Sequence, residues 1–195
     1  MSNQPLLEFV CQVVAYLDGW DLAGEQQYSH IHVDGPDGAA ISIGVDGFND
    51  FGPNARVEVS GCWPKAVPTD GTAIMFCPRG ESVTIRAAVG RGPEAVAGDI
   101  ARRLLPKYLP LYREQVRQRD QYLVREARRT ECMDRLAEVA GSETGTHDGK
   151  MYISAGETRV DAEIGVYDDG ARVTMKLYSV PFEKALRVVE ILERE

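Results

Sequence analysis

The stretch from Pro93 to Ala140 constrains the fold of this chain more than any other part of it. Proline suits the first helical position, because the N–H that it lacks would have no partner inside the helix. Beyond Pro110 neither glycine nor proline occurs until Gly141, which predicts a long helix with a kink or short break around Pro106 and Pro110. The middle of this helix is rich in Arg, Glu and Gln and poor in large apolar residues. Because so polar a helix has little core to join, we expect it to connect two separate bodies.

Amphipathic segments on both sides of the long helix predict an α+β protein with two small antiparallel-sheet-plus-helix units, each in the order α-β-β-β-α. The predicted organisation is an N-terminal unit over 1–110 with an insertion over 61–89, a charged spacer helix over 111–131, and a C-terminal unit over 132–195. A match between 43–45 and 164–166 leaves internal duplication and chance similarity as alternatives. The individual predictions are helices over 5–17 and from Pro181, a loop over 20–27, and strands over 28–34, 41–45, 57–59, 73–77, 82–89, 151–154, 159–167 and 172–180.

Charge is unevenly distributed along the chain, whose formal net charge is −8. Residues 1–90 carry 4 basic and 11 acidic side chains, residues 91–135 carry 11 and 7, and residues 136–195 carry 7 and 12. Wholesale nucleic-acid binding usually needs a basic face. The balance leaves open the reverse case, in which an acidic surface occupies a basic groove on another protein.

The remaining composition predicts a cytoplasmic protein that does not enter a membrane. No apolar run approaches the length of a bilayer span, and the N-terminus lacks the pattern of a signal peptide. The four cysteines show no C-x-x-C spacing, which predicts free thiols in a reducing compartment. A bridge between Cys62 and Cys77 is the alternative.

Catalytic signatures are missing from the sequence. It contains neither a nucleophile motif nor a phosphate-cradling glycine loop, so we expect a non-enzymatic protein without a cofactor. His30, His32 and Asp34 alternate on one predicted strand, a spacing that can present two imidazoles and a carboxylate to one metal ion. Exposed strand positions commonly carry polar residues, however, and no metal site is predicted. The order α-β-β-β-α is that of double-stranded RNA-binding domains, but the helix starts lack the clustered basic residues that such domains need.

The candidate partner-binding residues lie on the strand predicted over 159–167 and in the turn after it. Apolar residues at 160, 162, 164 and 166 should face the core, so the acidic residues between them should project outward. The simpler alternative is a solvated sheet face. The candidates are Asp161, Glu163, Asp168 and Asp169.

The polar middle of the long helix offers a second contact surface. Tyr112, Val116, Leu123 and Ala127 form a thin apolar seam at near-heptad spacing, which predicts a homodimer contact. The simpler interpretation, which the charge pattern favours, is a solvated charged helix, and a nucleic-acid contact through the arginines is a further alternative. The candidates on this helix are Arg113, Val116, Arg117, Leu123, Arg125 and Arg128.

The segment DIARRLLPKYLPLY, from Asp99 to Tyr112, precedes an Arg/Glu/Gln-rich helix and resembles a segment of uncharacterised phage and prophage proteins. The resemblance covers well under half of the chain and carries no active site. It implies a mobile-element origin, and small acidic proteins of such elements often act by binding, as anti-CRISPR and anti-restriction inhibitors do. The expected function is therefore inhibition of a host defence or nucleic-acid-handling complex through protein binding. A nucleic-acid-binding accessory protein and a small metal-dependent enzyme at His30 and His32 are the alternatives.

Overall fold

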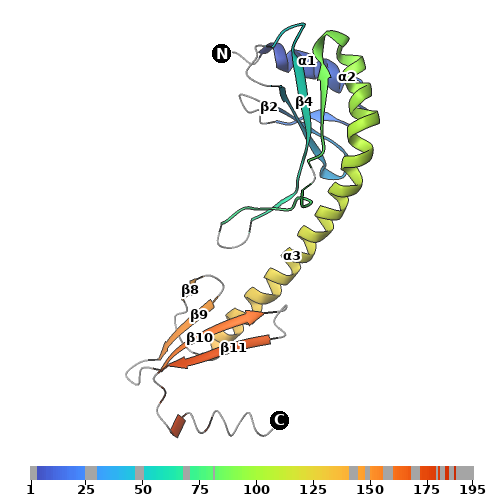
Figure 1. Ribbon diagram of the computed structural model, residues 1–195. Coiled ribbons are helices and arrows are strands. Elements are labelled where there is room, and N and C mark those ends of the chain that lie inside the picture. Colours follow the sequence, from blue (N-terminus) through green and yellow to red (C-terminus); the bar gives the residue numbers. More distant parts are fainter. Residues whose placement is uncertain are drawn as a thin grey trace. The chain divides into compact units, whose positions relative to one another are not determined.

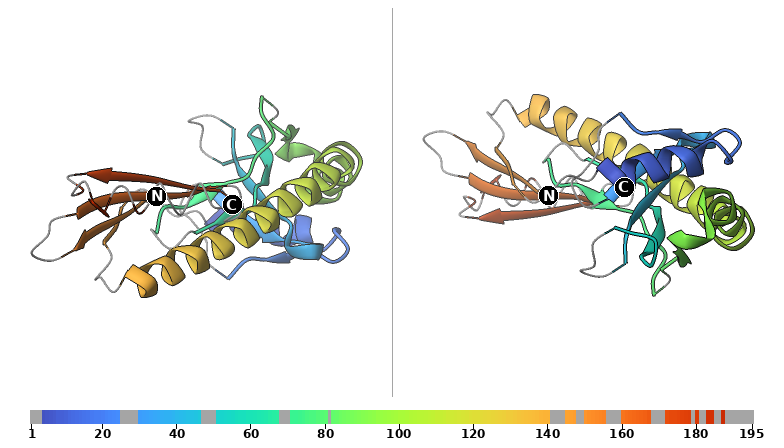
Figure 2. Two further views of the ribbon diagram at one scale, coloured as in Figure 1. Left: turned by 90° about the horizontal axis from the view of Figure 1, so that it is seen from below. Right: turned by 90° about the horizontal axis from the view of Figure 1, so that it is seen from above.

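The computed structural model describes residues 4–24, 30–46, 51–67, 71–80, 82–140, 145–147, 150–155, 160–167, 172–178, 180, 183–184 and 187. The chain divides into two compact units, Met1–Asp120 and Gln121–Glu195. Antiparallel sheets and helices build both units, which confirms the predicted α+β class. The boundary lies inside helix α3 (Leu105–Ala140), which runs through it without interruption (Figure 2).

A five-stranded antiparallel sheet forms the centre of the first unit (Figure 1). In spatial order its strands are β1 (Asp21–Leu22), β2 (His30–Asp34), β3 (Ala40–Val45), β4 (Arg56–Cys62) and β7 (Thr84–Ala88). The predicted insertion contributes edge strand β7 as well as a separate two-stranded arm, β5 (Lys65–Ala66) and β6 (Ile74–Met75). Strand β1 falls in a stretch predicted as a loop, because two residues are too few to show a period of two.

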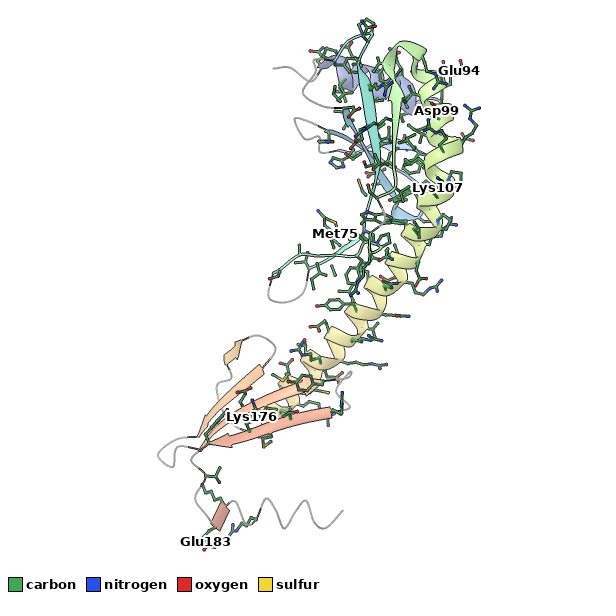
Figure 3. The ribbon with its side chains drawn as sticks, viewed as in Figure 1. Met75, Glu94, Asp99, Lys107, Lys176 and Glu183 are labelled. Atoms are coloured by element: carbon green, nitrogen blue, oxygen red, sulfur yellow. The ribbon has the colours of Figure 1, made fainter. Side chains whose placement is uncertain are left out.

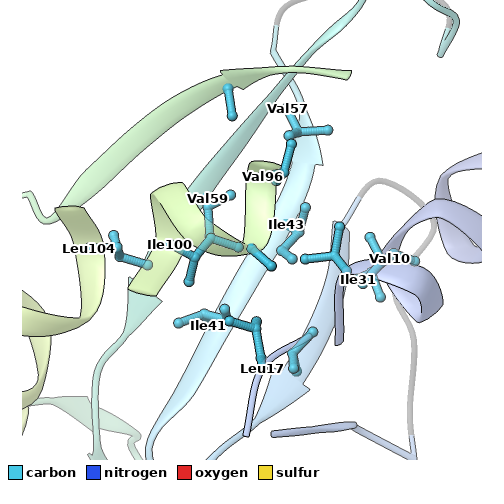
Figure 4. Packing of buried hydrophobic residues seen from close by; sticks show 14 of the residues in the cluster. Val10, Leu17, Ile31, Ile41, Ile43, Val57, Val59, Val96, Ile100 and Leu104 are labelled. Carbon is cyan, nitrogen blue, oxygen red and sulfur yellow. The ribbon is translucent and has the colours of Figure 1, made fainter. Parts of the chain in front are cut away.

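The helices of the first unit cover one face of this sheet. Helix α1 (Gln4–Val14) contacts β2 and β3, while α2 (Pro93–Asp99) and the turn after it contact β4 and β7. Alternating apolar residues of the strands pack against the apolar stripes of the helices there (Figure 4). The strand positions between them therefore lie on the opposite face. The buried side chains include Val10, Leu17, Ile31, Ile41, Ile43, Val57, Val59, Val96, Ile100 and Leu104.

Where a kink or short break is predicted around Pro106 and Pro110, the helical backbone instead continues through a π-helical turn, Ile100–Leu104, between α2 and α3. In this turn the N–H of Leu105 bonds to the carbonyl of Ile100, five residues earlier. Pro106 follows at once, and in a regular α-helix its ring would crowd the carbonyl four residues before it. The wider turn accommodates that ring, whereas Pro110 lies inside α3 without ending it. Because the long α3 is charged, no helix in the described part of the chain is suited to cross a membrane.

The second unit contains a four-stranded antiparallel sheet in the order β11-β10-β9-β8 (Figure 1). Its core holds Met133 of α3 together with Ile164 and Val166, the latter two facing inward as the alternation predicts. The final helix predicted from Pro181 falls mainly outside the described residues. The strands are β8 (Gly145–His147), β9 (Lys150–Ala155), β10 (Val160–Tyr167) and β11 (Arg172–Tyr178).

Candidate functional site

The face of the first sheet that points away from α1 and α2 is polar. Residues directly opposite each other on neighbouring strands share a face, so the strand register defines rows across it. One row contains His32, Ser42, Ser60 and Thr84, and the hydroxyl oxygens of Ser60 and Thr84 are 3.0 Å apart. These imidazole and hydroxyl groups can form hydrogen bonds with a partner but offer it little apolar area.

An acidic edge forms where β1 joins β2, and we define it as Asp18, Asp21 and Asp34. Asp21 lies directly opposite Asp34, and all three side chains are exposed. Like charges directly opposite each other destabilise a sheet. Within the described part of the chain, no basic side chain forms an ion pair with any of the three. Their charge is therefore available to an external cationic group.

Buried Trp20 fixes the position of the acidic edge. Its ring lies so close to the backbone of Gly35 that an added Cβ there would be 2.7 Å from three ring atoms. The N–H of Ala23 also donates to the carbonyl of His32 at 3.0 Å, which holds the chain after β1 against β2. Tyr16, which precedes Asp18 in the sequence, has a large amphipathic side chain that is 58% exposed.

Cys62 and His32 bring a thiol close to an imidazole on the polar face, with 3.8 Å between Sγ and Nδ1. A nucleophilic cysteine needs a lowered pKa. Burial instead raises the pKa of the Cys62 thiol above its ordinary value, and of the nearby charges Lys65 lowers this pKa while Asp34 raises it. The thiol therefore stays protonated at neutral pH and is a weak nucleophile.

The structure also bears on the metal site considered at β2 and on the alternative disulfide. His30, His32 and Asp34 lie on β2 at alternating positions, as predicted. Among the described residues, however, no three His, Cys, Asp or Glu side chains are arranged to hold a metal ion. All four cysteines are free thiols, so the alternative bridge between Cys62 and Cys77 is not formed.

The acidic candidates of the second unit are described only in part. Asp168 and Asp169 lie outside the described residues, as does the side chain of Asp161. Glu163 was expected to project into solvent, but its side chain is only 15% exposed. The reason is the strand register, which places Lys176 directly opposite, with 3.6 Å between Nζ and Glu163 Oε1. This carboxylate is therefore already neutralised within the sheet.

Arg113 and Arg117, two of the four candidate arginines of α3, form ion pairs with carboxylates. Arg113 pairs with Asp37 at 3.1 Å, and Arg117 pairs with Glu114 at 3.0 Å. Farther along α3, Arg129 pairs with Glu126 at 3.4 Å. The candidates Arg125 and Arg128 are exposed. Local pairing of this kind reduces the positive potential that a nucleic-acid contact would require.

The predicted apolar seam of α3 is shorter in the structure than in the sequence. Tyr112 is buried in the core of the first unit, and Val116 packs against that core. The part of the seam that remains accessible to a partner helix consists of Leu123, which is 41% exposed, and of Ala127, which is also exposed. The homodimer contact through this helix stays a prediction.

The sequence does not predict the acidic edge, because Asp21 falls in the stretch predicted as a loop. Only the pairing of β1 with β2 brings Asp21 opposite Asp34, and a two-residue strand leaves no periodic signal. Likewise, the sequence did not indicate that Val173 and Met175 of β11 would be exposed while their register partners Val166 and Ile164 are buried.

No family model, curated protein or solved structure matches this chain.

Proposed function

We propose that this protein is a non-enzymatic binding protein that inhibits a host defence or nucleic-acid-handling complex by placing an acidic surface on a basic surface of that complex. The proposed mobile-element origin rests on the resemblance of the segment from Asp99 to Tyr112. The proposed binding mode rests on the acidic edge of the first unit.

The observation that carries the proposal is the direct opposition of Asp21 and Asp34 on β1 and β2. Two carboxylates in this arrangement repel each other, so they lower the stability of the free protein. A basic partner would remove the repulsion and gain from the charge of both residues. Asp18 adds a third negative charge in the preceding turn, which strengthens long-range attraction of a cationic surface.

Two further features support a protein partner and a non-catalytic role. The raised pKa of Cys62 opposes nucleophilic catalysis by the thiol next to His32. The ion pairs of Arg113, Arg117 and Arg129 reduce the attraction of α3 for phosphates. Both features favour an acidic protein-binding surface over the alternative that uses the arginines of α3.

Affinity capture from host lysate with three forms of the protein tests the proposal. The neutralised form carries Asp18→Asn, Asp21→Asn and Asp34→Asn. The control carries Glu131→Gln, Asp134→Asn and Glu138→Gln, which changes the net charge equally at three exposed positions of α3. The wild type and the control should retain the same host protein, and the neutralised form should lose it.

Equal retention by all three forms would contradict a role for the acidic edge. Retention of nucleic acid alone, sensitive to nuclease, would contradict a protein partner. The neutralised form should be at least as stable as the wild type, because its substitutions remove a repulsion. A loss of binding therefore cannot be attributed to unfolding if its thermal midpoint is unchanged or higher.

A further inference from the structure

Three arginines surround one buried carboxylate at the junction of α2 and the π-helical turn. The side chain of Asp99 is 7% exposed, and its oxygens lie 2.5 Å from Arg91, 3.5 Å from Arg102 and 3.7 Å from Arg103. Figure 3 shows Asp99 on the same helical segment as Glu94, the other carboxylate of α2. We call Arg91, Arg102 and Arg103 the arginine cluster. It lies apart from the acidic edge and has no part in the function proposed above.

Hydrogen bonds to the backbone anchor two members of the cluster, Arg91 and Arg102. Arg91 ends a short turn in which the N–H of Val89 donates to Ala55 and the N–H of Gly92 donates to Val89, each at 3.0 Å. The Nε–H of Arg102 donates to the carbonyl of Gly98 at 3.0 Å. Arg102 and Arg103 both belong to the π-helical turn, a type of irregularity that occurs frequently at functional sites.

The charge of the cluster is not balanced by the groups that it contacts. Arg91 alone satisfies one oxygen of Asp99 at short range, whereas Arg102 and Arg103 stand beyond the usual hydrogen-bond distance. Among the described residues, Glu94 forms no ion pair with any of the three arginines. Three positive charges therefore face one negative charge, which leaves an excess of two.

Another ion network of the same unit shows the opposite balance. Arg86 alone contacts two carboxylates, Asp46 at 3.3 Å and Glu58 at 3.1 Å. A structural network of this kind has no need of a further anion. In the arginine cluster the repulsion among the guanidinium groups is relieved only in part by Asp99, so a second anion would stabilise it. The three arginine side chains are 51%, 73% and 54% exposed, which leaves their N–H groups accessible to such an anion.

We propose that the arginine cluster binds a dianionic phosphate group, either inorganic phosphate or the terminal phosphate of a small phosphomonoester. The two charges of a phosphate dianion match the excess, and guanidinium groups form paired hydrogen bonds with phosphate oxygens. A phosphodiester of nucleic acid carries one charge per group and fits the excess less well. Asp99 acts as the positioning residue that gathers the three arginines.

Titration calorimetry at constant ionic strength tests this site with inorganic phosphate, a nucleoside monophosphate and dimethyl phosphate as separate ligands. The first two should bind, and dimethyl phosphate should bind at least about tenfold more weakly. Binding of the monophosphate should weaken as the pH falls through its second pKa of about 6, because the dianion is lost. Tighter binding of dimethyl phosphate, or of a DNA oligonucleotide without terminal phosphates, would overturn the assignment to a dianion.

The variant Arg102→Gln, Arg103→Gln should weaken phosphate binding about tenfold or more. Its matched control is Arg113→Gln, Arg117→Gln, which removes two exposed arginines that each have a carboxylate partner. The control should bind phosphate as the wild type does, and both variants should fold because all four side chains are exposed. Equal affinity in the cluster variant and the wild type, or an equal loss in the control, would overturn the proposal.

Discussion

Tyr108 joins the first turns of α3 to the sheet of the first unit through one hydroxyl group. Its oxygen lies 2.8 Å from the carbonyl oxygen of Ala40 and 2.5 Å from that of Cys62, two residues that lie opposite each other where β3 begins and β4 ends. The ring packs over Gly61, where an added Cβ would approach it to 2.2 Å. A glycine and a tyrosine 47 positions apart thus form one packing unit, which no local sequence pattern could reveal.

The buried environment of Tyr108 predicts a loss of stability at alkaline pH. Burial raises the pKa of this phenol far above its ordinary value of 10.0, and burial likewise raises the pKa of Cys62 above 9.0. Both groups have a higher pKa in the folded state than in the unfolded state, so their contribution to the free energy of unfolding is complete below about pH 9. That contribution declines as the pH rises, because the groups ionise first in the unfolded chain. Urea unfolding between about pH 9 and 11 should show this decline.

The variant Tyr108→Phe separates the contribution of the phenol from that of the thiol. It should lose about 1–3 kcal/mol at neutral pH, because the two part-buried carbonyls lose the one hydroxyl donor that they share. Its alkaline decline should be shallower than that of the wild type, since one of the shifted groups is gone. Parallel declines in the two proteins would show that Tyr108 ionises equally in the folded and unfolded states.

At the level of elements, periodicity predicted the strands whose apolar residues alternate and the helices with an apolar stripe. It predicted β2, β3, β4 and β7 because each is long enough to repeat the pattern. It could not predict β1, nor the neutralisation of Glu163 by Lys176, because both depend on which strands are neighbours and in which register. An irregularity near Pro106 was predictable from the proline ring itself, but its form, a π-helical turn instead of a break, was not.

Helix α3 changes along its length from a core element to a polar one, and two substitutions should separate these roles. Leu104, in the turn just before α3, is fully buried, so Leu104→Ala should cost roughly 2–5 kcal/mol of stability. Leu123 is 41% exposed, and Leu123→Ala should cost less than about 1 kcal/mol. Denaturant unfolding measures both, and similar losses would contradict the polar role of the middle of the helix.

At the scale of the whole molecule, two acidic stretches of the sequence flank a basic one, and local ion pairs join three arginines of α3 to carboxylates of the same helix. The acidic edge differs because two of its carboxylates, Asp21 and Asp34, lie directly opposite each other, and none of its three forms an ion pair with a described residue. On this account the negative charge of the first unit is a recognition feature that draws the protein to a basic partner. Electrostatic attraction of this kind acts mainly on the association rate and is screened by salt.

The association rate with the captured partner, measured at low and raised salt, tests this account most directly. The wild type and the variant Glu131→Gln, Asp134→Asn, Glu138→Gln should associate at the same rate, and raised salt should slow both steeply. The variant Asp18→Asn, Asp21→Asn, Asp34→Asn should associate about tenfold more slowly at low salt and respond weakly to added salt. An unchanged rate and salt dependence in that variant would contradict recognition through the acidic edge.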